Sequence, residues 1–145
     1  LRTHTTAASA RALYLNPNPP IKAFTIGPVY RRENITFKHL PVFYQVDGII
    51  ADENANFATL IGTLTEFLKK MGFLKFEFRP SFFPYTEPST EVYAFNEEKK
   101  TWFEIAGAGI FREEVTKPLG CNVPVLAWGF GFERLVMLRY NIKDI

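Results

Sequence analysis

The sequence has very little cysteine and histidine: one cysteine, Cys121, and two histidines, His4 and His39. A single cysteine excludes an internal disulfide framework and a zinc site built on several cysteines. The two histidines do not have the spacing of zinc ligands, and no serine–histidine–aspartate order is evident. We therefore expect a reducing, cytoplasmic setting and a buried, unreactive thiol at Cys121.

Charge of one sign and long apolar runs are also lacking. The 17 basic and 15 acidic residues leave a net charge of +2 without any block of like charges, so charge alone does not predict a surface for polyanions. No apolar run reaches the ~18 residues of a membrane span, and no signal peptide is evident. The length is typical of one domain. Because the sequence begins at Leu1 rather than methionine, we expect a piece of a longer protein.

Aromatic residues are abundant, with 15 phenylalanines, six tyrosines and two tryptophans. Such side chains dominate both protein cores and binding pockets. Apolar periodicity predicts helices over 7–14, 54–71 and 130–140. Alternation predicts strands over 23–31, 42–50, 73–79, 91–95, 101–105 and 123–129. This order indicates an α+β fold, mostly an antiparallel sheet with helices packed on one side.

Several segments between these elements carry signals of their own. Thr5 or Thr6 is expected to cap the first helix, and Gly72 to end the second. A polar ten-residue loop separates the first two strands. The glycines of 106–111 permit close backbone approach, and 112–122 is expected to be a surface link.

The first two strands carry the most informative pattern. Because side chains alternate along a strand, Phe43, Gln45 and Asp47 share one face of the second strand. The first strand ends in Arg31, with Glu33 close behind. An aromatic ring, an amide, a carboxylate and a guanidinium suit a ligand that combines a flat ring, a phosphate and an amine. An ordinary hairpin with a solvated face is the alternative.

Arginines and carboxylates elsewhere extend this interpretation. Arg31, Arg32 and Arg134 could each meet phosphate, since a guanidinium matches phosphate oxygens two at a time. Magnesium needs only one or two carboxylates when substrate phosphates are present. Most of the remaining acidic residues are therefore expected to be structural partners of the arginines.

Four stretches in this order resemble a known family: LRTHTT, VYRRENITFKHLPVFYQVDG, FRPSFFPYTEPSTEV and AWGFGFERLVMLRYNIKDI. They resemble the catalytic domain of phenylalanyl-tRNA synthetase alpha subunits, which are class II aminoacyl-tRNA synthetases. The resemblance covers essentially the whole chain, which implies a single, partial catalytic domain over 1–145. It implies a ligase that activates L-phenylalanine with ATP and transfers it to tRNA(Phe), with Mg²⁺ accompanying the ATP.

The resemblance also implies roles for individual residues. The YRRE stretch resembles motif 2, whose loop contains His39, and GFER resembles motif 3. Arg31 and Arg134 would be catalytic, and the ATP-binding residues would be Arg31, Glu33, Phe43 and Arg134. The phenylalanine-binding residues would be His4, Thr6, Gln45, Asp47, Phe83, Tyr85, Phe111 and Ala127. Among these, Gln45 and Asp47 would bind the α-amino group and Ala127 would form the floor of the ring pocket. Glu87 matches a magnesium-binding position.

Partners follow from the same resemblance. It implies a beta subunit in a two-alpha two-beta heterotetramer, and it places motif 1 and an N-terminal tRNA-binding region upstream of Leu1. Two other interpretations stay open at this point: a non-catalytic synthetase-like module that binds nucleotide or a partner, and a class II ligase for another amino acid. The FFPY aromatic pair and the small Ala127 favour phenylalanine over a charged substrate.

Overall fold

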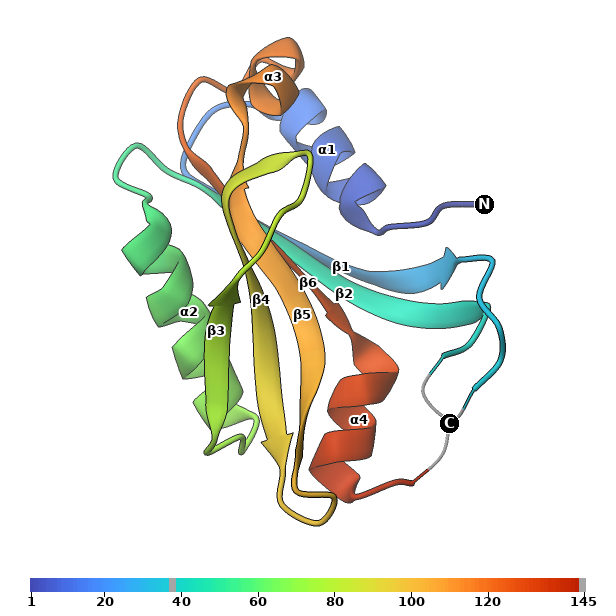
Figure 1. Cartoon of the computed structure of the whole chain (residues 1–145). Coiled ribbons are helices and arrows are strands. Elements are labelled where there is room, and N and C mark those ends of the chain that lie inside the picture. The colour runs from blue at the N-terminus through green and yellow to red at the C-terminus, as the bar shows by residue number, and fades with distance from the viewer. Residues whose placement is uncertain (37–38, 144–145) are drawn as a thin grey trace.

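The protein, described here from a computed structural model over residues 1–36 and 39–143, is built on one antiparallel sheet. Within those residues its strands are β1 (Ile21–Tyr30), β2 (Val42–Ala51), β3 (Phe76–Pro80), β4 (Thr86–Asn96), β5 (Thr101–Phe111) and β6 (Val125–Gly131). Their spatial order is β1-β2-β6-β5-β4-β3 (Figure 1). The helices are α1 (Thr6–Leu15), α2 (Phe57–Lys70), α3 (Glu113–Thr116) and α4 (Phe132–Tyr140), with a 3₁₀ turn η1 at Lys117–Leu119. The α+β expectation is thus confirmed.

Helix α2 covers one face of the sheet. Its buried residues Leu60, Leu64 and Leu68 recur every four positions and pack with Leu126 and Phe130 of β6. Burying side chains of this size stabilises the fold by about 1.5–3 kcal/mol each. The helix begins after Asn56, whose side chain accepts from Thr59 N at 3.0 Å, and Gly72 follows its end with φ +85°. The expected glycine stop is therefore confirmed.

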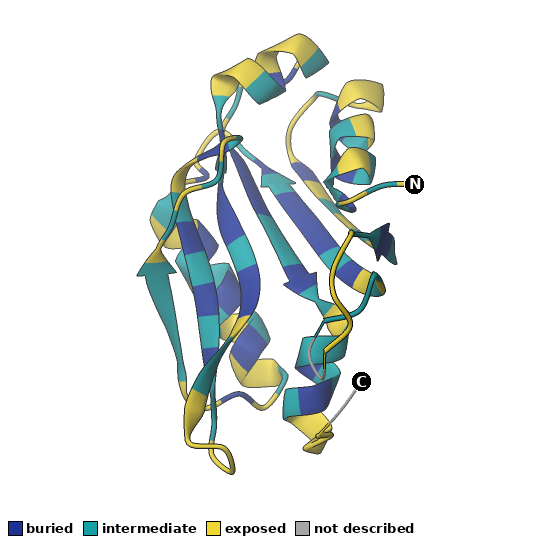
Figure 2. Cartoon of the chain, turned by 45° about the vertical axis from the view of Figure 1, so that its right-hand side comes forward, coloured by how far each residue is buried: buried dark blue, intermediate teal, exposed yellow. Residues whose placement is uncertain are grey.

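Helix α1 covers the opposite face, so the expectation that the helices pack on one side is wrong. Leu13 of α1 is buried with Ile49, Phe111, Val125 and Ala127. The reason lies in β6, which sends Val125 and Ala127 to one face and Leu126 and Phe130 to the other. Both faces are apolar, so both must be covered. Figure 1 shows α1 with α3 at the top of the view, away from α2, and Figure 2 shows the burial concentrated on the central strands.

Several predicted boundaries differ from the structure. Strand β5 continues through 106–111, because its glycines let other segments lie against it without interrupting the ladder. Strand β4 begins at Thr86 rather than 91, and the predicted surface link contains α3 and η1. The loop between β1 and β2 lies where expected, although its residues 37 and 38 fall outside the described ranges. Among the described residues, no helix has the length and apolar character to cross a membrane.

Candidate active site

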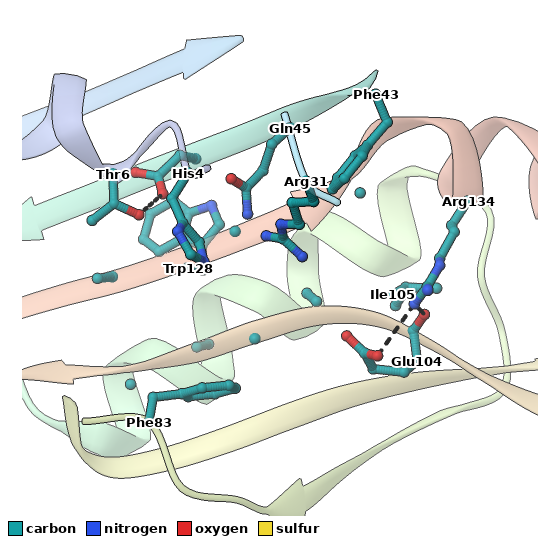
Figure 3. A pocket seen from close by; sticks show the side chains of 18 of the residues that line it. His4, Thr6, Arg31, Phe43, Gln45, Phe83, Glu104, Ile105, Trp128 and Arg134 are labelled. Atoms are coloured by element: carbon teal, nitrogen blue, oxygen red, sulfur yellow. Dashed lines mark hydrogen bonds and ion pairs between the residues drawn. The ribbon is translucent and has the colours of Figure 1, made fainter. Parts of the chain in front are cut away.

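A cavity of about 400 Å³ opens on the sheet face that carries Phe43, Gln45 and Asp47 (Figure 3). Every residue that the resemblance assigns to ATP or phenylalanine lines it. These residues are His4, Thr6, Arg31, Glu33, Phe43, Gln45, Asp47, Phe83, Tyr85, Phe111, Ala127 and Arg134. They come from α1, β2, β5, β6, α4 and the segments between elements, so the fold gathers in one place residues that are far apart in the sequence.

One end of the cavity is an aromatic pocket. The rings of Phe83 and Tyr85 are stacked with centroids 6.2 Å apart, and Phe111 meets Tyr85 edge-on at 6.3 Å. His4 approaches Tyr85 from another side at 6.4 Å, and Ala127 contributes a small side chain to the wall. Such a pocket suits a flat apolar group.

Two facing glycines make room on the floor of the cavity. Gly107 of β5 pairs with Gly129 of β6. A Cβ on Gly107 would lie 2.8 Å from the Phe83 ring, and a Cβ on Gly129 would lie 2.8 Å from Gln45 Nε2. Real Cβ contacts of that length are not tolerated, so these two side chains occupy space that only glycine leaves open.

Asp47 is a buried carboxylate with hydroxyl partners. Thr6 Oγ1 donates to its Oδ2 at 2.8 Å, and Ser9 Oγ donates to its Oδ1. Burial raises the pKa of Asp47, and the hydrogen bonds from Ser9 and Thr6 oppose that rise. Among the described residues no lysine, arginine or histidine forms an ion pair with it. A cationic group that binds beside such a buried carboxylate would stabilise its ionised form.

The charge of Asp47 affects the pKa of another residue in the pocket, Tyr85. Burial, and after it the Asp47 carboxylate, raises the pKa of Tyr85, so its hydroxyl keeps its proton. The pKa of His4 is lowered by burial first and by Arg31 second. His4 is therefore neutral at pH 7, and Asp47 is the negative centre of this end of the cavity.

Gln45 is held by the residue that begins α1. Thr5 donates to Gln45 Oε1 twice, from its backbone N at 3.0 Å and from its Oγ1 at 3.2 Å. Thr5 stands at the predicted N-cap of α1, but its side chain makes no capping bond because the hydroxyl is directed to Gln45. The carboxamide nitrogen of Gln45 lies over Gly129.

Arg31 and Arg134 lie toward the other end of the cavity. Arg31 Nε donates to Thr3 O at 3.2 Å, and its guanidinium carbon is 5.0 Å from the centroid of the Phe43 ring. Arg134 Nη1 donates to Glu104, to the backbone O at 2.9 Å and to Oε2 at 3.2 Å. Arg134 Nη2 also donates to His39 Nε2 at 3.3 Å. Both guanidinium groups thus face the cavity and are held in place (Figure 3).

Two acidic residues near the cavity form ion pairs with arginines. Glu104 pairs with Arg134, as expected for an acidic residue that supports an arginine. Glu87, which the resemblance assigns to magnesium, pairs with Arg112. Glu133, beside Arg134, accepts instead from the backbone N of Tyr44 at 2.7 Å. That contact ties the start of α4 to β2 just beyond the point where the β2–β6 ladder ends.

Comparison with known proteins identifies the family. A sequence model of the tRNA synthetases class II core domain matches residues 1–145. The chain belongs to the class II tRNA synthetase family. Phenylalanine–tRNA ligase alpha subunits from Methanothermobacter thermautotrophicus and Methanocaldococcus jannaschii are each 56% identical to it over 100% of its length. The alpha subunit from Methanopyrus kandleri is 54% identical over the same share. The chain spans 28%, 31% and 28% of these relatives, respectively.

Class II synthetases use ATP with Mg²⁺, which makes Glu87 important to examine. Its carboxylate accepts from Arg112 Nη2 at 2.6 Å, its side chain is 70% exposed, and it does not line the cavity. Within the described ranges, no group of three or more acidic, histidine or cysteine residues is placed to hold a metal ion. The residues around Glu87 therefore do not fit a preformed magnesium site, and its role stays a prediction.

Sequence reasoning missed the hydroxyl residues that support Gln45 and Asp47 in this cavity. Thr5 and Ser9 are both buried, and they hold Gln45 and Asp47, respectively. One signal could have found them. Ser9 follows Thr6 by three positions and Thr5 by four, so a helix that begins at Thr6 places these hydroxyls on one side, facing β2.

Proposed function

We propose that this chain is the amino-acid-activating core of a phenylalanine–tRNA ligase alpha subunit. It would join L-phenylalanine to ATP as phenylalanyl-adenylate and release pyrophosphate, before the amino acid is transferred to tRNA(Phe). One observation carries the proposal: Asp47, a buried carboxylate with no cationic partner among the described residues, lies in the same cavity as an aromatic pocket and two arginines. The names of the relatives support phenylalanine as the amino acid.

The amino acid matches one end of the cavity group by group. Its ammonium would pair with the Asp47 carboxylate, beside the hydroxyl of Thr6. Its phenyl ring would lie against Phe83 and Tyr85, with Phe111 in the same region and Ala127 leaving room near the para position. An apolar pocket rejects an added hydroxyl only about a hundredfold, so this wall limits tyrosine rather than excluding it.

ATP matches the other end. Arg31 would bind the α-phosphate, and Arg134 would bind the γ-phosphate or the adenine. Glu33 and Phe43 would contact the adenine. In this structure Arg31 lies over Phe43 and Arg134 is paired with Glu104, so nucleotide binding would exchange these contacts for phosphate and adenine. The substrate carboxylate attacks the α-phosphorus, and no protein nucleophile is needed. The arginines stabilise the charge that spreads over the phosphate oxygens.

The wider assembly is part of the same proposal. The relatives are named alpha subunits, which supports a beta subunit as partner, in a two-alpha two-beta heterotetramer. The terminal hydroxyl of tRNA(Phe) would attack the mixed anhydride of the adenylate. A translation enzyme of this kind would work in the cytoplasm.

The direct test is amino-acid-dependent exchange of labelled pyrophosphate into ATP, measured on the complete protein with any subunit that co-purifies. We expect exchange with phenylalanine and at least about tenfold less with tyrosine at equal concentration. Exchange that depends on a different amino acid would indicate another class II ligase. Nucleotide binding without exchange in a folded, complete assembly would indicate a non-catalytic module.

Replacing Ala127 with glycine tests the ring pocket. Ala127 is only 7% exposed and lines the cavity beside Tyr85 and Phe111, so removing its methyl group enlarges the pocket. A change of one methylene in such a pocket alters discrimination by about 10- to 200-fold. We expect the preference for phenylalanine over its para-chloro analogue, measured as a ratio of kcat/KM values in exchange, to fall by about tenfold or more. An unchanged ratio would show that Ala127 does not face the para position.

A further inference from the structure

The segment 81–85, which joins β3 to β4, carries two rings of the aromatic pocket. Phe83 and Tyr85 are half-buried and line the cavity, and the Phe83 ring occupies the space over Gly107. Phe82, the residue before them, is 77% exposed and adds little packing. The positions of the two rings therefore depend on the hydrogen bonds that hold this segment to the sheet.

Ser81 fixes the β3 end of the segment with two hydrogen bonds. Its backbone N donates to Ser89 O at 3.2 Å, and its Oγ donates to Glu91 Oε1 at 3.0 Å. At the other end, Arg112 N donates to Tyr85 O at 3.0 Å. Within residues 1–36 and 39–143, the Glu91 carboxylate is the one side chain that forms a hydrogen bond with the segment.

Glu91 accepts from hydroxyl groups although an arginine stands opposite it. Arg79 of β3 is its cross-strand partner, but the Arg79 guanidinium pairs with Glu77 and lies 3.9 Å from the centroid of the Tyr93 ring. Tyr93 Oη donates to Glu91 Oε2 at 2.9 Å, so each carboxylate oxygen accepts one hydroxyl. In the part of the chain that the structure describes, no basic residue forms an ion pair with Glu91. Glu91 thus departs from the expectation that the remaining acidic residues support arginines.

The carboxylate lies close to the ring that it helps to place. Glu91 of β4 pairs with Gly107 of β5, and the Phe83 ring lies over that glycine. A Cβ on Gly107 would be 2.8 Å from this ring, which leaves the ring little freedom toward the sheet. Figure 3 shows Phe83 on the β5 side of the cavity. Because Ser81 precedes Phe83 by only two residues, a shift of Ser81 would move the ring relative to the rest of the pocket.

We propose that Glu91 is a positioning residue that determines how closely the pocket fits the ring of the amino acid. It acts through Ser81, whose hydroxyl it holds, and so fixes the wall that Phe83 forms. Neither Glu91 nor Ser81 lines the cavity, so neither touches the substrate. This inference rests on the proposed function and deepens it, because it adds a residue that sets specificity from outside the pocket.

The test measures amino-acid discrimination by pyrophosphate exchange in the complete protein, with any subunit that co-purifies. The readout is the ratio of kcat/KM for phenylalanine to kcat/KM for its para-chloro analogue. Glu91→Ala should lower this ratio by about five- to tenfold, because a looser Phe83 wall admits the larger ring. The KM for ATP should stay within about twofold of wild type. Glu91→Gln should keep the wild-type ratio, because its carbonyl oxygen still accepts from Ser81 and its NH₂ can donate to Tyr93 Oη.

Two further variants separate the two hydroxyl partners of the carboxylate. Ser81→Ala should lower the ratio as far as Glu91→Ala does, and the double variant should lower it no further, because both changes break the same hydrogen bond. Tyr93→Phe is the matched control: it removes the other hydroxyl from the same carboxylate and should leave the ratio unchanged. Ser81→Ala deletes a single oxygen at a half-buried site, so it keeps the proposal testable if Glu91→Ala does not fold.

Three results would overturn the assignment. An unchanged ratio in Ser81→Ala would show that this hydroxyl does not place the Phe83 wall. An equal loss of exchange with both amino acids in Glu91→Ala would show that Glu91 supports only the fold. A lower ratio in Tyr93→Phe with a normal one in Ser81→Ala would show that the carboxylate acts through Tyr93. Failure of the proposed function looks different, because the wild-type protein would then show no exchange that depends on phenylalanine.

Discussion

Replacing Arg31 with alanine is expected to lower phenylalanine-dependent pyrophosphate exchange by about 10²- to 10³-fold. The proposed function assigns Arg31 to ATP; its guanidinium carbon is 5.0 Å from the Phe43 ring centroid and its Nε donates to Thr3 O. A preorganised cation at the α-phosphorus stabilises charge that appears mainly in the transition state. The loss should therefore fall on kcat more than on the binding of phenylalanine.

The lysine variant is the matched control for this arginine. Arg31→Lys keeps the positive charge but loses the planar fork that matches two phosphate oxygens. We expect it to recover part of the exchange rate lost in Arg31→Ala. Near-normal exchange in the alanine variant would contradict the assignment of Arg31 to the α-phosphate. A loss of phenylalanine affinity equal to the loss of exchange would instead point to a collapse of the Thr3–His4 segment, since Arg31 holds Thr3.

The second large effect is expected at Asp47. Asp47→Asn should weaken phenylalanine binding by about a hundredfold or more, because it removes the buried charge that balances the ammonium. The same change should not lower the free energy of unfolding at pH 7. Burial raises the pKa of Asp47, which means that the ionised carboxylate is costly to fold. Asparagine removes this cost while it keeps an acceptor for Thr6 or Ser9.

The direction of the pH dependence follows from this raised pKa. The folded chain keeps a proton on Asp47 at pH values where the unfolded chain has lost it. The contribution of this group to stability is therefore greatest below its ordinary pKa and declines as the pH rises through the raised value. Phenylalanine binding has the opposite dependence, because the ammonium needs the ionised form. Its affinity should be complete above the raised pKa and should fall as the pH drops below it.

Calorimetric titration of phenylalanine and chemical unfolding, both measured over a pH series, would check these expectations. The pH-dependent part of the affinity should disappear in Asp47→Asn. An asparagine variant that binds phenylalanine normally would remove Asp47 from the amino-acid site. A markedly less stable asparagine variant would show that the carboxylate serves to hold α1 on the sheet through Thr6 and Ser9, and not to bind a ligand.

The sequence alone determined the local part of this architecture. Period-two alternation put Phe43, Gln45 and Asp47 on one face of a strand, and the structure places all three on the cavity. Four-residue spacing and Gly72 marked α2 and its end. These inferences held because they depend on backbone periodicity, which neighbouring residues decide. The family resemblance added which distant segments belong to one site.

Only the tertiary structure decided what these residues contact. Helices cover both sheet faces because β6 is apolar on both. The sequence pattern of a strand does not tell which helix packs on which of its faces. Thr5 turns its hydroxyl from the helix cap to Gln45, a residue 40 positions away. Gly129 opens the space beside that amide because β2 and β6 are neighbours in the sheet. The orientation of Gln45 and the burial of Asp47 arise from contacts between segments far apart in sequence, so they exist only once the chain has folded.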